Sequence, residues 1–112
     1  MSNSVFQSVI MQLKDATDRV LGVMDAEGCV VACTDVTVLG ERWADTAVKV
    51  GAGADGIVVC AQKTFKPMIG ASNYFEYAVF CSGEDELARG MAVAAYVALS
   101  DAKNYYEDKH DR

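Results

Sequence analysis

The sequence contains few of the residues that mark a metal site or a catalytic centre. Its single histidine is His110, and no arrangement of Ser, His and Asp or of Cys and His indicates nucleophilic catalysis. The four cysteines lie inside apolar runs, and the spacing of Cys29 and Cys33 differs from that of a zinc knuckle. We therefore expect buried free thiols in a protein that is not an enzyme and that holds neither a metal nor a cofactor. Thiol chemistry at Cys60 or Cys81 is the alternative, although buried cysteines are usually inert.

Positive charge and long apolar runs are also scarce. The chain has 10 lysines and arginines against 16 aspartates and glutamates, a net charge of −6, whereas nucleic-acid partners require clustered basic residues. No stretch reaches the ~18 apolar residues of a membrane span. The N-terminus lacks the basic and then apolar order of a secretion signal. We expect a cytoplasmic protein that has neither nucleic acid nor a membrane as a direct partner.

The clearest local pattern is the stretch 20–35, VLGVMDAEGCVVACTD. Two runs rich in β-branched and small residues, 20–24 and 29–33, suit a half-buried sheet. Between them stand Asp25, which can accept hydrogen bonds from its own turn, and Gly28, which tolerates positive φ. The stretch therefore predicts a β-hairpin around which a small antiparallel sheet forms.

Hydrophobic periodicity and breaker residues predict the remaining elements. The expected elements are a helix over 4–18, a short helix over 40–51, strands over 57–61, 68–71 and 74–81, and a long helix over 84–109. A hydrophobic fraction of 52% in 112 residues supports one core, so residues 1–112 are expected to form one domain. The fold class is α+β: a central antiparallel sheet of about five strands flanked by an N-terminal helix and a long C-terminal helix.

Two features predict positions within this sheet. The run 57–61 is apolar on both faces, which favours a central strand. Pro67, the only proline, confines the piece 63–67 to an edge or a turn. In the strand 74–81, Glu76 marks either the wetter face or a polar pocket.

The last helix is expected to be capped near Ser82 or Gly83 and to have a length of about 39 Å. Because a domain of this size is about 30 Å across, the helix should project beyond the sheet. Nothing in 101–112 ends it, so we expect 84–112 to lead toward a further part of a longer protein. Its apolar stripe comprises Leu87, Met91, Ala95, Ala98, Ala102 and Tyr106. The alanines permit a close helix approach, as a dimer interface needs.

This order of elements resembles the N-terminal sensor domain of carbohydrate (sugar) diacid regulators, bacterial transcription factors related to the purine-catabolism-regulator type. Thr34-Asp35 and Leu39-Gly40 stand at the places of that family's small-residue–Asp pair and hydrophobic–Gly step. The closing residues 105–112 are similar to the junction with the downstream parts. The resemblance implies a PAS-, GAF- or profilin-like domain that binds a small metabolite, forms a dimer and controls an absent helix-turn-helix output domain.

The candidate ligand-binding residues lie in the two connections that cross the sheet face. Arg42 can hold a carboxylate through two parallel N–H bonds, and Trp43 offers a flat apolar wall. The candidate set is Asp35, Gly40, Arg42, Trp43, Lys66, Ser72 and Asn73, with Lys63 and Tyr74 completing the rim. Each residue also has an ordinary structural role: Trp43 as a core anchor, the cations as solvated side chains, and Ser72 and Asn73 as turn formers.

Two functions follow. The first is a small-molecule-sensing and dimerising input domain of a bacterial transcription regulator. Its ligand is a metabolite, with a carboxylate as the candidate class, and its homodimer forms through the terminal helices. Ligand binding would shift the population of helix arrangements. The second is a roadblock-like module for protein–protein interaction and dimerisation, without a ligand. A thermal-shift screen separates the two, because a ligand that binds only the folded state stabilises it.

Overall fold

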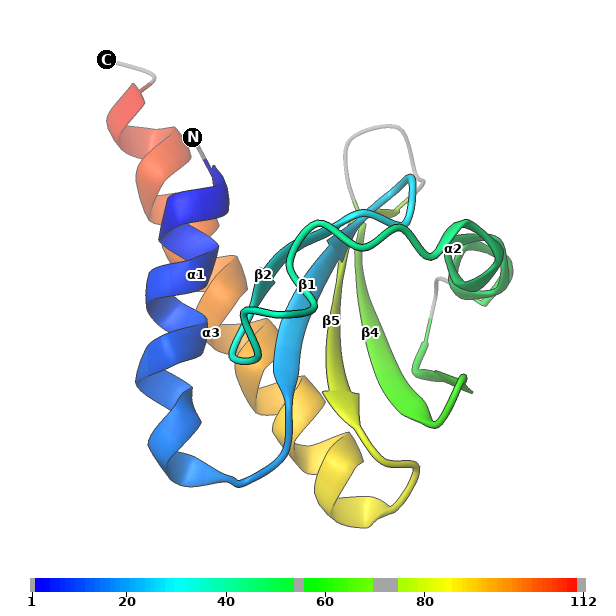
Figure 1. Cartoon of the computed structure of the whole chain (residues 1–112). Helices are drawn as coiled ribbons and strands as arrows, with labels where there is room; N and C mark the ends of the chain where they lie inside the picture. The colour runs from blue at the N-terminus through cyan, green and yellow to red at the C-terminus, as the bar shows by residue number, and fades with distance from the viewer. Residues whose placement is uncertain (1, 54–55, 70–74, 111–112) are drawn as a thin grey trace.

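The chain folds into one five-stranded antiparallel sheet with helices on both faces (Figure 1). The computed structural model describes residues 2–53, 56–69 and 75–110, with side chains described in 5–53, 56–68 and 76–102. The elements are α1 (Ser2–Leu13), the 3-10 turn η1 (Lys14–Ala16), β1 (Leu21–Asp25), β2 (Val30–Cys33), α2 (Ala44–Ala52), β3 (Val58–Cys60), β4 (Lys63–Ile69), β5 (Phe75–Ser82) and α3 (Glu86–His110). The strand order is β2-β1-β5-β4-β3. The α+β class, the sheet and its two flanking helices are confirmed.

The hairpin of β1 and β2 forms where the sequence predicts it. The Asp25 carboxylate accepts hydrogen bonds at 2.9 Å from the backbone N–H groups of Glu27 and Cys29. Gly28 has a φ of +92°, a conformation that favours glycine. These two residues fix the reversal of the chain, and β1 then pairs with β5 on its other side.

The edge of the sheet at β2 is covered by other parts of the chain. The side-chain amide of Gln7 on α1 accepts a hydrogen bond from the Cys33 N–H at 2.9 Å and donates one to the Cys33 carbonyl at 3.0 Å. Farther along, Val30 exchanges backbone hydrogen bonds of 2.9–3.0 Å with Gly40 and Glu41. The outward backbone groups of Val30 and Cys33 are therefore satisfied within the molecule, which protects this edge from pairing with another chain.

At the opposite edge, the expected positions of two strands are corrected. β3 is the edge strand, and 57–61 does not lie at the centre of the sheet. Its apolar pattern arises because Val58 and Cys60 pack into the core on the α2 side, while Val59 is 44% exposed. The turn to β4 has positive φ at both Ala61 and Gln62.

Pro67 lies in β4, between β5 and β3, and not in an edge strand or turn. The Gly83 N–H donates to the Gln62 carbonyl at 2.8 Å, so the backbone polar groups of Gln62 face the end of β5. Counting on from Gln62, every second residue of β4 points its N–H and carbonyl groups toward β5. Lys66 and Met68 are such residues, so the nitrogen of Pro67 points to the other side. Val58, the first residue of β3, pairs with Phe65, so β3 does not reach the position opposite Pro67. The missing N–H of Pro67 therefore interrupts no hydrogen-bond ladder between described strands.

Two hydrophobic clusters cover the two faces of the sheet. The first lies under α1 and α3 and contains Phe6, Ile10, Leu21, Val23, Ala32, Met68, Val79, Cys81, Ala88, Ala92, Ala95 and Leu99. The second lies on the α2 side and contains Met24, Val30, Cys33, Ala47, Val50, Phe65, Ala78 and Phe80. Adjacent residues of β5 alternate between the clusters, as the period of a strand requires.

In the long helix α3, Ala95 of the expected stripe is buried and Met91 packs against the core, but the other fully buried positions lie one residue later than the stripe. Its buried residues are Ala88, Ala92, Ala95 and Leu99, whereas Leu87 is 54% exposed. The cap also differs from the expectation of Ser82 or Gly83. The carboxylate of Asp85 accepts a hydrogen bond from the Ala88 N–H at 3.2 Å, which makes Asp85 the N-cap.

Figure 1 shows α1 and α3 side by side, with the start of α1 beside the end of α3 and away from the sheet. The 25 residues of α3 span about 37 Å at 1.5 Å per residue. In the described ranges, no helix has both the length and the apolar character that crossing a membrane requires.

Candidate functional site

The loop before α2 is the first of the two connections predicted to bind a ligand. Gly40 has a φ of +88°, and the segment 40–43 then runs alongside the start of β2. Cys29 and Arg42 form an isolated bridge, and the Trp43 N–H donates to the Gly28 carbonyl at 2.7 Å. Because 40–43 is extended, α2 begins later than the predicted residue 40. The backbone of this loop is occupied by its contacts with the hairpin.

The side chains of this loop divide between the core and solvent. Trp43 is half-buried, its ring centroid lies 5.1 Å from that of Phe80, and its indole N–H donates to Glu41 at 3.0 Å. The ammonium of Lys63 lies 4.8 Å from the Trp43 ring centroid, a cation–π contact. Arg42 is exposed, and its guanidinium has no hydrogen bond or ion pair with another described residue. Trp43 therefore anchors the second cluster, and Arg42 stays accessible to an anion.

The structure does not bring Lys66 to this loop. Lys63 and Lys66 are three apart on β4, so they point to opposite faces of the sheet. The ammonium of Lys66 lies 4.4 Å from the ring centroid of Tyr96 on α3. Ser72 and Asn73, with Tyr74, lie outside the described residues. Of the expected rim, Lys63 alone is seen beside Trp43.

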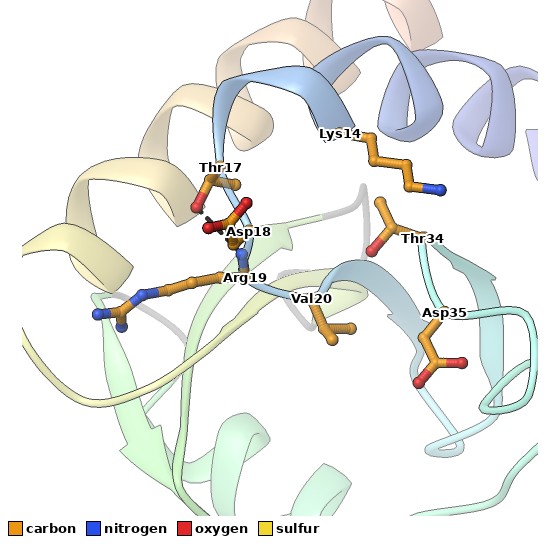
Figure 2. A pocket seen from close by; sticks show the side chains of 7 residues that line it. All are labelled: Lys14, Thr17, Asp18, Arg19, Val20, Thr34 and Asp35. Carbon is orange, nitrogen blue, oxygen red and sulfur yellow. Dashed lines mark hydrogen bonds between the residues drawn. The ribbon is translucent and has the colours of Figure 1, made fainter.

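A pocket of about 400 Å³ lies elsewhere, where η1 leads into β1 beside the end of β2 (Figure 2). Its volume falls within the range of small-molecule sites, roughly 300–1,000 Å³. The residues that line this η1 pocket are Lys14, Thr17, Asp18, Arg19, Val20, Thr34 and Asp35. Asp35 is the one member of the predicted set among them.

Polar groups of both charges face the η1 pocket. Lys14 is exposed and makes no ion pair with other residues in the described ranges. Its side chain lies over Thr34, whose hydroxyl oxygen accepts a hydrogen bond from the Leu21 N–H at 3.2 Å (Figure 2). Asp35 accepts hydrogen bonds from the hydroxyl and the N–H of Thr37, at 2.6 and 3.0 Å. These bonds lower the pKa of Asp35, so its carboxylate is charged at neutral pH.

Arg19 connects the η1 pocket to α3. Its guanidinium donates two hydrogen bonds to Asp85, at 2.6 and 2.7 Å, and one to the Ser82 carbonyl at 3.2 Å. The paired hydrogen bonds raise the pKa of Arg19 and, with the Ala88 N–H, lower the pKa of Asp85. In Figure 2 the Arg19 side chain points away from the other lining residues. Because Asp85 caps α3, this ion pair links the connection before β1 to the start of that helix.

Sequence reasoning missed most of this pocket because the first helix was expected to continue to residue 18. α1 instead ends at Leu13, and the residues after it form η1 and an extended connection. The signal that could have located the pocket is the run Lys14-Asp15-Ala16-Thr17-Asp18-Arg19, which carries charges of both signs directly before the hairpin.

The described residues offer little for metal or thiol chemistry. No group of three or more His, Cys, Asp or Glu side chains among them is arranged to hold a metal ion. All four cysteines are free, and burial raises the pKa of the Cys33, Cys60 and Cys81 thiols. A raised pKa reduces the thiolate that nucleophilic chemistry requires.

Comparisons with protein-family models, with curated proteins and with solved structures each found no match.

Proposed function

We propose that this protein is the small-molecule-sensing and dimerising input domain of a bacterial transcription regulator that acts in the cytoplasm. The single observation that supports it most is the connection from the η1 pocket to α3. A ligand in this pocket would contact the residues on either side of Arg19, and Arg19 holds the cap of the long helix.

The mechanism we propose is a population shift. The ligand would bind one arrangement of the connection 17–20 more tightly than another, and the Arg19–Asp85 pair would carry that preference to the first turn of α3. The size of the shift is limited by the difference in ligand affinity between the two arrangements. Hydrogen exchange at the N–H groups of Ala88 and Arg89, which bond to Asp85, should slow when ligand is bound.

The proposed ligand carries a carboxylate. Lys14 and Thr34, which both line the η1 pocket, supply an ammonium and a hydroxyl. Arg42, accessible beside Trp43, is the second position at which a carboxylate could bind. The η1 pocket is favoured as the ligand site because it is concave, whereas the side chain of Arg42 is exposed and only its backbone bridges to Cys29.

A thermal-shift screen against small organic acids and purine breakdown products tests the proposal. We expect at least one compound to raise the melting temperature, since a ligand at 100 times its Kd stabilises the folded state by about 2.7 kcal/mol. For that compound, Lys14→Ala should abolish the shift, while Lys49→Ala on α2 should preserve it. Loss of the shift in Arg42→Ala alone would place the ligand at the loop beside Trp43. No stabilisation by any compound would contradict a sensing function.

A roadblock-like module without a ligand is the second candidate. The observation that favours it is the apolar side chains that α3 exposes, Leu87 at 54% and Val97 at 52%. A contiguous exposed apolar patch marks a surface that meets another protein, and Leu87 and Val97 would supply two residues of such a patch. A chain that dimerises and responds to no compound in the screen would support this candidate.

A further inference from the structure

The η1 pocket carries charges of both signs in an unequal set. Lys14 supplies one ammonium, and Asp18 and Asp35 supply two carboxylates. Arg19 also lines the pocket, but its guanidinium is paired through two hydrogen bonds with Asp85, so its charge is already balanced. A ligand therefore meets one cation and two anions.

The hydrogen-bonding capacity of these groups is partly free. The Thr34 oxygen accepts from the Leu21 N–H, and its own proton remains available to a ligand oxygen. Asp35 uses only Oδ1 toward Thr37, which leaves Oδ2 as an acceptor. Asp18 has no hydrogen bond through its carboxylate within the described ranges. The pocket thus offers donors at Lys14 and Thr34 and acceptors at Asp18 and Asp35.

This arrangement discriminates among classes of ligand by charge. A dicarboxylate brings two negative charges to a site that already holds two carboxylates and a single ammonium. A simple amine matches the carboxylates but leaves Lys14 facing a like charge. A zwitterion satisfies both kinds of charge, with its carboxylate toward Lys14 and Thr34 and its ammonium toward one of the two aspartates.

We infer that the η1 pocket binds a small zwitterion that carries a carboxylate and an ammonium group, with free α-amino acids as the ligand class. The inference rests on the proposed sensing function and specifies its ligand. The side chain of Val20, which lines the same pocket, gives an apolar contact to the aliphatic part of such a ligand (Figure 2). By the same reasoning, a dicarboxylate such as a sugar diacid should bind this pocket more weakly than an amino acid does.

Isothermal titration calorimetry on the full chain tests the inference with three matched probes: L-valine, 3-methylbutanoate, which lacks the ammonium, and 2-methylpropylamine, which lacks the carboxylate. L-Alanine and L-serine extend the class, and succinate represents the dicarboxylates. We expect the amino acids to bind at least about tenfold more tightly than either singly charged analogue, because each loses one charge-assisted contact. Lys14→Gln should remove the advantage of L-valine over the amine. Asp18→Asn should reduce its advantage over the acid.

The control variants are Asp15→Asn and Lys49→Gln, which change exposed charges that do not line the pocket. Both should bind L-valine as the unchanged chain does. Binding of succinate but of no amino acid would overturn the inference and leave the proposed sensing function standing. Equal binding of L-valine to the Lys14 and Asp18 variants would also overturn it. The absence of binding by every probe, together with a negative thermal-shift screen, would overturn both.

Discussion

Replacing Gln7 with alanine should destabilise the fold by about 1–3 kcal/mol. The substitution removes two hydrogen bonds, each with a net contribution of roughly 0.5–1.5 kcal/mol, from the backbone of Cys33. Cys33 is fully buried, so its N–H and carbonyl groups lose partners that water replaces poorly. Alanine favours the helix by a few tenths of a kcal/mol, which offsets a small part of the loss.

Gln12→Ala is the matched control, because Gln12 is exposed on the same helix and makes no side-chain hydrogen bond with a described residue. Urea unfolding of both variants, followed by circular dichroism, isolates the contribution of the two bonds as the difference between their free energies of unfolding. Equal values for the two variants would refute the reasoning, since they would show that Cys33 needs no partner from α1.

Gln7→Glu separates the two hydrogen bonds. A carboxylate can still accept from the Cys33 N–H, but it cannot donate to the Cys33 carbonyl and is repelled by it. At neutral pH this variant should be destabilised at least as much as Gln7→Ala. Below the ordinary carboxyl pKa of about 4.3 the protonated side chain can donate again, and the deficit relative to the unchanged chain should shrink.

Two further predictions concern the ion pair and the sheet. Because Arg19 lowers the pKa of Asp85 below its ordinary value of 3.8, the stability from that carboxylate is present above this value and lost as the pH falls below it. Arg19→Met should therefore lose less stability on acidification, and an unchanged pH dependence of the urea midpoint would contradict this. Gly22→Ala should destabilise by about 1–3 kcal/mol, because the new methyl group would lie 2.7 Å from Cε2 of the Phe80 ring. Gly56→Ala, whose methyl group meets nothing within 4 Å, is the control, and equal unfolding midpoints would refute the steric argument.

The parts of the fold that sequence predicts well are those with local causes. The reversal at Asp25 and Gly28 needs only turn chemistry, and it forms as expected. The turn from β3 to β4 carries no such signal, because Ala61 and Gln62 adopt positive φ without being glycine or asparagine. The sequence of 57–61 and of the residues after it therefore does not predict the β3–β4 hairpin or the position of β3 at the edge of the sheet.

The phase of α3 could not be predicted because its sequence is apolar on more than one face. Leu87 and Ala88 both continue apolar stripes, and only the packing against α1 and the sheet decides which one is buried. Prediction of the candidate site from the sequence had the same limit, because tertiary packing decides which side chains come together. Asp35 lines the η1 pocket, whereas Lys66 faces α3 and Lys63 faces Trp43, because residues three positions apart on a strand point to opposite faces of the sheet.

Closure of only one edge of the sheet limits how this molecule can polymerise. Gln7 and the loop at Gly40 block β2, whereas β3 carries no further strand in the described part of the chain. A fibre that grows by continuing the sheet requires two free edges on every copy, so that each chain can pair with a neighbour on both sides. Edge-to-edge pairing through β3 would therefore end after two copies, because the β2 edge of each copy already has its partners.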